Sequence, residues 1–191
     1  MNAGNGHRLG EILAAVEKKA AFTSWRKDNK KAFLTSAFTM VSSAEQILEG
    51  KEWLFSYYDT ADDTFTTFSS EGAQKATKEQ AFKEGETLPA LNLSTIKVEA
   101  AGCINKAEEL KNKEYKGQQA SKIIAILQPL RSDEITGSSQ KSKESPSAIT
   151  VWNLTYITTA YNVINVKIDA ASGNVLSHKM SGVMDFMNKD K

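Results

Sequence analysis

The side chains in this chain that could do chemistry are few and widely spaced. The 191 residues include one cysteine, Cys103, and two histidines, His7 and His178. A thiol and an imidazole form a nucleophile–base pair only within hydrogen-bond reach, and nothing local brings Cys103 and His178 together. Three such ligands are also too few for the usual four-ligand zinc site. We therefore expect no metal, no cofactor and no catalytic residue.

The acidic residues give no stronger signal for chemistry. Asp59, Asp62 and Asp63 gather at the tip of an expected hairpin. They could bind a hard cation, but a solvated acidic turn is the better interpretation. Glu108 and Glu109 are adjacent on an expected helix and face different directions, so they are not paired for acid–base work. No nucleophile elbow, phosphate loop or dinucleotide fingerprint is present, which favours a protein that is not an enzyme.

Five aromatic residues are the candidate binding residues: Trp53, Tyr57, Tyr58, Trp152 and Tyr156. Four of them share one side of their expected strands, and Tyr58 falls on the opposite side from Trp53. Those four could form an exposed platform that grips a peptide or another protein. The alternative is that they form the core beneath the helices, and this is the stronger interpretation.

Composition narrows the class of protein further. The 24 Lys and Arg residues against 23 Asp and Glu give a net charge of +1. This removes the electrostatic basis for a dedicated nucleic-acid binder, which normally shows a basic face. A hydrophobic share of 40% supports a core. No apolar run approaches the roughly 20 residues that span a bilayer. We expect a soluble chain without a membrane span, cytoplasmic as written, or exported if a leader preceded it.

The elements that must position these residues alternate between helical and strand periodicity. The first half predicts a helix over 9–22, a strand over 33–41, a connector over 42–51 and a hairpin from 53–58 and 64–68. A surface helix or linker over 71–86 and a short strand over 91–98 follow.

In the second half, Asn105 resembles a helix N-cap and Gly117 a stop. The strands are expected over 122–127, 149–158, 163–168 and 174–180, with a mobile loop over 131–146 and a frayed tail from 181. A tight turn over 169–173 joins the last two strands.

The two hairpins look alike. An offset of 99 residues places Trp53 on Trp152, Tyr57 on Tyr156 and Phe65 on Ile164, and the order of elements repeats with them. The sequence therefore predicts an α+β protein of two tandem helix-plus-antiparallel-sheet units packed together. We expect the first unit over residues 8–72, a connector over 73–103, and the second unit over 104–182 with its mobile loop at 131–147.

The end of the second half resembles a PepSY domain. An aromatic strand over 152–156, its partner over 163–168 and the closing sequence Asp-Ala-Ala-Ser-Gly-Asn-Val-Leu over 169–176 carry the resemblance. The first half lacks the Asp-Ala pair, so it resembles a degenerate copy. The resemblance implies a helix packed on an antiparallel sheet, with Asp169 and Gly173 as structural turn residues. It also places the chain near two-repeat beta-lactamase inhibitor proteins, which implies a propeptide, inhibitor or binding module.

These observations lead to one preferred function and two alternatives. The preferred function is a non-catalytic, regulatory or inhibitory module that binds a protein or peptide through a sheet face or edge. The first alternative is a small-molecule-binding or enzymatic α+β domain with a pocket between helix and curved sheet. The second is a homo-oligomeric structural protein. We expect a monomer or a homodimer.

Overall fold

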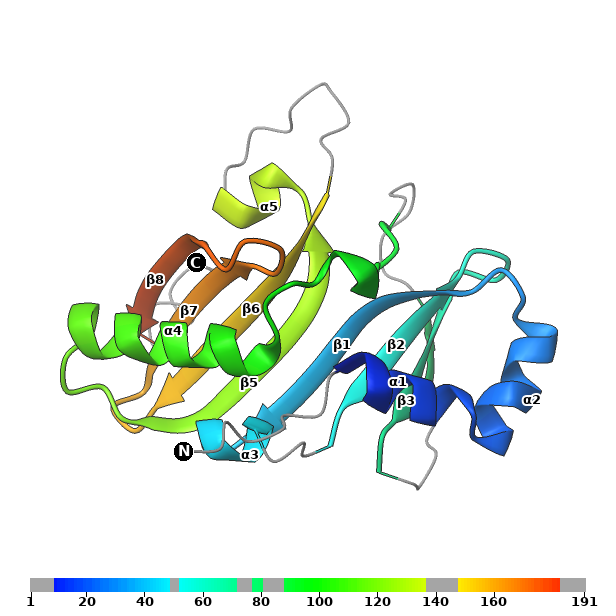
Figure 1. The fold of residues 1–191 in the computed structure, drawn as a ribbon, viewed down its shortest axis with the longest axis horizontal. Coiled ribbons are helices and arrows are strands. Elements are labelled where there is room, and N and C mark those ends of the chain that lie inside the picture. Colours follow the sequence, from blue (N-terminus) through cyan, green and yellow to red (C-terminus); the bar gives the residue numbers. More distant parts are fainter. Residues whose placement is uncertain (1–8, 49–51, 72–76, 81–87, 137–147, 183–191) are drawn as a thin grey trace, which may run out of the picture.

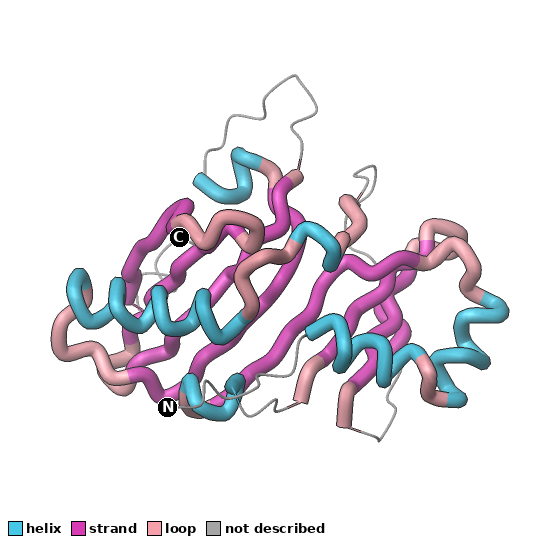
Figure 2. Tube along the Cα trace, in the orientation of Figure 1, coloured by secondary structure: helices cyan, strands magenta, loops and turns pink. Residues whose placement is uncertain are grey.

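An antiparallel sheet of eight strands forms the centre of the computed structural model, and helices pack against it (Figures 1 and 2). The structure describes residues 9–48, 52–71, 77–80, 88–136 and 148–182. The α+β class expected from the sequence is confirmed.

The first half of the chain contributes three helices and four strands. They are α1 (Leu9–Glu17), α2 (Ala20–Asp28), β1 (Phe33–Val41), α3 (Ala44–Leu48), β2 (Leu54–Asp59), β3 (Thr64–Ser69) and β4 (Thr77–Gln80). The strand expected over 33–41 is confirmed. The helix expected over 9–22 is two helices, because the chain turns at Lys18 and Lys19 before α2 begins.

The second half contributes the remaining elements. They are a short 3-10 helix η1 (Leu93–Thr95), α4 (Ala100–Glu114), β5 (Ala120–Leu130), α5 (Ser132–Thr136), β6 (Ile149–Thr158), β7 (Asn162–Asp169) and β8 (Val175–Gly182). The strand expected over 149–158 is confirmed. The tail expected from 181 lies outside the described residues from 183 onward.

Four expectations for single segments are wrong. The segment 91–98 is no strand: the side chain of Asn92 accepts from the backbone N–H of Ser94 and starts η1 instead. Helix α4 begins at Ala100 rather than near Asn105. The stretch 71–86 includes strand β4, and the loop expected from 131 begins with α5, while residues 137–147 lie outside the described residues.

The sheet is continuous across both halves, in the strand order β4-β3-β2-β1-β5-β6-β7-β8. Its middle is the pairing of β1 with β5, which we call the seam; it joins Ala37–Val41 to Ile123–Leu127. Ala37 and Ala125 are fully buried there. The core also crosses the seam, because the rings of Trp53 and Trp152 meet edge to face at 6.1 Å.

The two faces of the sheet differ. Helices α1, α2 and α4 cover one face, which we call the helix face (Figure 1). Helix α5 lies against the other, which we call the open face: the Lys167 ammonium and the Ser177 hydroxyl, both on that side, donate to the carbonyl of Ile135 at 3.0 Å. Any surface offered by the central strands therefore belongs to the open face.

Candidate functional site

Four of the five predicted aromatic binding residues lie in the core. Trp53 and Tyr57 are 3% and 1% exposed, and Trp152 and Tyr156 are fully buried. These side chains point to the helix face beneath α1, α2 and α4. An exposed platform made from these four is therefore corrected to a core, because amphipathic helices cover the face on which the aromatic alternation falls.

Tyr58, the fifth predicted residue, lies on the open face between two phenylalanines. Phe33 of β1 and Phe65 of β3 pair with it in register, and their ring centroids lie 5.7 and 5.2 Å from that of Tyr58. The Tyr58 hydroxyl donates to the Asp63 carboxylate at 2.6 Å, and this bond raises the pKa of the hydroxyl. We call these three half-buried side chains the aromatic row.

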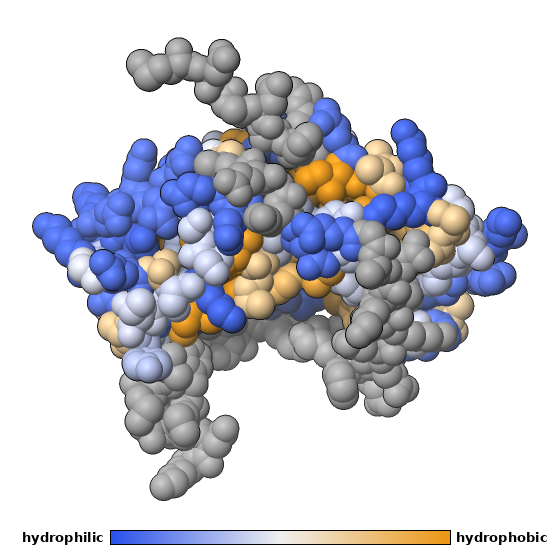
Figure 3. All heavy atoms as spheres, turned by 90° about the horizontal axis from the view of Figure 1, so that it is seen from below, coloured by the Kyte–Doolittle hydropathy of each residue, from blue (hydrophilic) through white to orange (hydrophobic). Residues whose placement is uncertain are grey.

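Apolar side chains continue from the aromatic row toward the seam. Phe38 is paired on one side with Leu54 and on the other with Ile126, all three half-buried. Two residues further along β1, Met40 is 51% exposed and pairs with Ile124. Seen from below, the described hydrophobic residues gather toward the middle of the molecule, with hydrophilic residues toward both ends (Figure 3).

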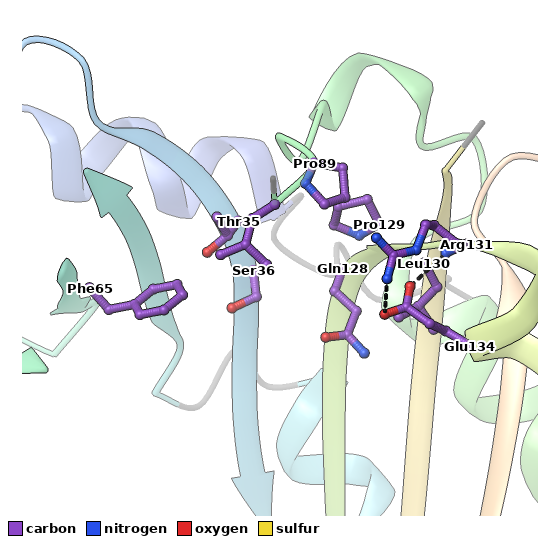
Figure 4. A pocket seen from close by; sticks show the side chains of 10 residues that line it. Thr35, Ser36, Phe65, Pro89, Gln128, Pro129, Leu130, Arg131 and Glu134 are labelled. Atoms are coloured by element: carbon purple, nitrogen blue, oxygen red, sulfur yellow. Dashed lines mark hydrogen bonds and ion pairs between the residues drawn. The ribbon is translucent and has the colours of Figure 1, made fainter. Parts of the chain in front are cut away.

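A cavity of about 260 Å³ opens where the seam ends. The pairing of β1 with β5 stops at Ala37 and Leu127, and beyond this point the two strands separate. Figure 4 shows the side chains that line the gap. They come from β1, β3, β5, α5 and the segment before η1: Thr35, Ser36, Phe65, Leu88, Pro89, Gln128, Pro129, Leu130, Arg131 and Glu134. Phe65 therefore belongs both to the aromatic row and to the cavity.

The lining of this cavity suits binding. Phe65 lies on one side and Pro129 on the other, with Ser36 and Gln128 as polar groups between them (Figure 4). At one end, the Arg131 guanidinium lies 3.6 Å from the Glu134 carboxylate, which also accepts from the backbone N–H of Arg131 at 2.8 Å. Apolar walls with a few placed polar groups are typical of a site that receives a side chain or small ligand.

The predicted thiol and imidazole are apart. Cys103 is fully buried near the start of α4, and burial raises its pKa to about 12, so it is not an activated nucleophile. The Nδ1 atom of His178 and the Tyr115 hydroxyl form a hydrogen bond at 2.7 Å, just past the end of α4. The length of the helix, at about 1.5 Å per residue, separates the two groups.

The three hairpin aspartates accept hydrogen bonds from residues of their own hairpin. Asp59 is 5% exposed and its carboxylate accepts from the backbone N–H of Ala61 at 2.8 Å. Asp62 accepts from the hydroxyl of Thr64. Asp63 holds the Tyr58 hydroxyl and adopts a positive φ of 54°. Among the described residues, no three His, Cys, Asp or Glu side chains are grouped so that they could hold a metal ion.

The turn that carries the family resemblance is built as its composition predicts. The Asp169 carboxylate accepts from the backbone N–H of Ala171 at 2.8 Å, and Gly173 adopts a φ of 73°. The carbonyl of Gly173 accepts from the ammonium of Lys106 on α4 at 2.6 Å. Asp169 and Gly173 thus shape a turn that also anchors the helix.

Comparison with known proteins gives no family assignment. No family model and no curated protein matches the chain. The crystal structure of a "putative lipoprotein" from Clostridium difficile 630 aligns over 84% of this chain and 90% of its own, with a TM-score of 0.47 and 11% identical residues. Within the described residues, no helix is long and apolar enough to cross a membrane.

Sequence reasoning missed most of the open-face site. It named Tyr58 but not Phe33, Phe65 or Phe38, nor the cavity beside them. A signal existed for two of the phenylalanines, since strict alternation places Phe38 and Phe65 on the face opposite the buried positions. Phe33 reaches that face only because the register shifts between Leu34 and Ser36, which alternation does not predict. The cavity had no local signal, because strands distant in sequence form it.

Proposed function

We propose that this protein is a non-catalytic module that binds a protein or peptide on the open face of its sheet. The observation that supports this most is the aromatic row lying against the cavity at the end of the seam. Aromatic side chains in a recognition surface supply large contact area at low entropic cost.

Recognition would use both parts of this surface. A partner side chain enters the cavity between Phe65 and Pro129, and neighbouring partner residues lie across Tyr58 and Phe33. The apolar residues at the seam, Phe38 and Met40, extend the contact toward the centre of the sheet. A regulatory or inhibitory role follows when the bound partner is an enzyme.

A displayed random-peptide library tests this proposal. We expect the protein to select peptides with an apolar or aromatic anchor, and the doubly substituted variant Tyr58→Ser, Phe65→Ser to bind them at least about tenfold more weakly. Glu109→Ser, on the exposed side of α4, is the matched control and should bind as the unaltered protein does.

Two results would contradict the proposal. The first is a library that yields no peptide above background. The second is a set of selected peptides that bind the doubly substituted variant as tightly as the unaltered protein. Circular dichroism of the variant serves as the folding check, because both substituted positions are only half-buried.

We also propose that the two halves are tandem PepSY-like units. The strand order is symmetric about the seam, and an offset of 88 residues aligns the residue range of α3 with that of α5, and Ala37 with Ala125. The same offset carries Phe38 onto Ile126, and these two residues pair with each other across the seam. A two-fold axis that related the two halves would pass through this pair.

A shared side-chain arrangement supports this duplication. The Tyr57 hydroxyl donates to Glu17 at 2.7 Å, and the Arg26 guanidinium lies 5.4 Å from the tyrosine ring centroid. In the second half, the Lys111 ammonium lies 5.4 Å from the Tyr156 ring centroid, and the Glu108 carboxylate raises the pKa of the Tyr156 hydroxyl in addition to the larger effect of burial.

The strand register corrects one position of the sequence alignment between the halves. Tyr57 pairs with Thr66, and Tyr156 pairs with Ile164, so the counterpart of Ile164 is Thr66 and not Phe65. The cause is the turn: four residues separate β2 from β3, but three separate β6 from β7. Phe65 therefore points to the open face, where Val163 is its counterpart.

A further inference from the structure

A second, polar hollow lies on the other side of the sheet from the proposed peptide surface. It measures about 550 Å³ and lies between α3, α4 and the start of β5. Its lining is mostly hydrophilic: Ser42, Ser43, Ala44, Glu45, Asn105, Glu108, Lys111, Asn112, Gln118, Gln119, Ala120 and Ile123. We call it the α3–α4 groove. Its volume falls within the usual range for small-molecule sites.

A buried charge forms part of this groove. Lys111 is 7% exposed, and its ammonium lies 2.7 Å from the Glu108 carboxylate. A lysine ammonium has three N–H donors, and the described residues provide one carboxylate and one aromatic ring, that of Tyr156, for them. Burying a lysine with donors to spare is costly, so the arrangement needs a reason.

The Tyr156 hydroxyl beneath the groove is also without a partner. It is fully buried and makes no hydrogen bond within the described structure. Its neighbours place it under the groove, because Ile123, its partner on β5, and Lys111, above its ring, both line the hollow. In the other half, the corresponding hydroxyl of Tyr57 is satisfied by Glu17. Burial, and next the Glu108 carboxylate, raise the pKa of the Tyr156 hydroxyl, and this hydroxyl itself is not part of the groove lining.

The charge balance of the lining determines the class of ligand. Glu108 and Lys111 neutralise each other at the floor, and Glu45 is fully exposed at the rim. An anion would meet Glu108 and a cation would meet Lys111, so neither is favoured. The amides of Asn105, Asn112 and Gln119 make no hydrogen bond within the described residues and offer both donors and acceptors.

We propose that the α3–α4 groove binds an uncharged polyhydroxylated ligand, a mono- or disaccharide. Sugar hydroxyls both donate and accept, so they match a lining of carboxylate, ammonium and amide groups. Glu108 accepts from ligand hydroxyls, and Lys111 and the amides donate to ligand oxygens. This site is independent of the proposed peptide surface.

Titrations followed by ¹H–¹⁵N NMR test the proposal. The probes are methyl α-glucoside, N-acetylglucosamine, lactose and cellobiose, with glutamate and spermidine as ionic comparisons. We expect at least one sugar to shift the amides of Asn105–Asn112 and Gln118–Ala120 saturably, while the ionic probes shift none. Absence of sugar shifts would mean that water alone fills the groove, and stronger shifts with an ionic probe would equally overturn the proposal.

Three variants assign the binding to this groove. Asn112→Ala is exposed on α4 and should weaken the bound sugar about three- to tenfold without changing the unfolding midpoint. Tyr156→Phe removes a hydroxyl that is fully buried and absent from the lining, so it should bind the sugar normally. Lys113→Ala, 81% exposed on α4 and absent from the lining, is the control and should bind normally. Unchanged binding by Asn112→Ala would overturn the assignment.

Discussion

The two tyrosines beneath the helices differ in one hydrogen bond. Tyr57 donates to Glu17, whereas the hydroxyl of Tyr156 has no partner among the described residues. We therefore predict that Tyr57→Phe lowers the free energy of unfolding by about 1–2 kcal/mol, because it also leaves the Glu17 carboxylate without its donor. Tyr156→Phe should cost less than about 0.5 kcal/mol or stabilise the protein.

Urea unfolding of the two variants side by side measures this difference. Each substitution removes one oxygen from a ring at a corresponding buried position, so each variant is the control for the other. Equal losses of stability would contradict the assignment of the hydrogen bonds.

The Cys103 thiol should make stability depend on pH in the alkaline range. Burial raises its folded pKa from 9.0 to about 12, so the folded state keeps a proton that the unfolded state releases. Its contribution is complete below about pH 9 and is lost as pH rises toward 12, at about 1.4 kcal/mol per pH unit.

The comparison of Cys103→Ala with the unaltered protein isolates this effect. Unfolding midpoints between about pH 8 and 10.5 should fall more steeply for the protein that keeps the thiol. Native Cys103 should also resist thiol reagents until denaturant is added, since it is fully buried. Parallel pH profiles of the two proteins would contradict the prediction.

At the scale of elements, two glycines with left-handed backbone offer a matched test of the turn after β7. Gly173 has a φ of 73°, and a Cβ there would lie 3.1 Å from a methyl of Val98. Gly117, after α4, has a φ of 78° and nothing within 4 Å. Gly117→Ala should cost about 1–2 kcal/mol from backbone strain alone, and Gly173→Ala should cost more.

Thermal or urea denaturation of both variants gives the comparison. The extra loss in Gly173→Ala measures the packing of the 91–98 segment on the turn, where the N–H groups of Lys97 and Val98 both donate to the carbonyl of Ala170. If Gly173→Ala loses no more stability than Gly117→Ala does, the result contradicts that packing.

The elements with clear periodicity could be predicted from the sequence, and those fixed by distant contacts could not. The strands at 33–41 and 149–158 match expectation because their alternating or apolar runs are long. The segment 91–98 has strand-like composition, yet the indole N–H of Trp152 donates to the carbonyl of Val98 and draws the segment over the sheet end. Helix α4 starts early because Cys103 and Ile104 are buried against the sheet.

The candidate site was predictable only in part. Alternation placed Tyr58 on the face away from the core, which the structure agrees with. Sequence patterns could not show that α4 and α1 share one face and leave the other for Phe33, Tyr58 and Phe65. The cavity depends on where β1 and β5 stop pairing, which is a contact between residues such as Ala37 and Leu127.

At the scale of the whole molecule, the seam should make unfolding a single cooperative step. The sheet and the core both run across it, through β1 with β5 and through Trp53 with Trp152. The chain has three tryptophans, so one variant can keep only Trp25 and another only Trp152 as reporter. In each variant the fluorescence midpoint in urea should match the midpoint from circular dichroism.

Separate transitions would contradict this expectation. If the Trp25 reporter and the Trp152 reporter each departed from the dichroism curve of its own variant, the halves would be unfolding independently. The comparison is made within each variant, because both variants lose the ring contact across the seam and the variant that keeps only Trp25 also loses the fully buried Trp152 ring.

The seam also sets an order of events while the chain is being synthesised. The strand β1 emerges from the ribosome long before β5, since nearly half of the chain lies between the paired residues Ala37 and Leu127. Until then β1 is an edge strand with Phe38 and Met40 beside unpaired backbone groups, which is a template for pairing with another chain. The nascent first half is therefore the stage most exposed to aggregation, and a chaperone that shields this edge should raise the yield of folded protein.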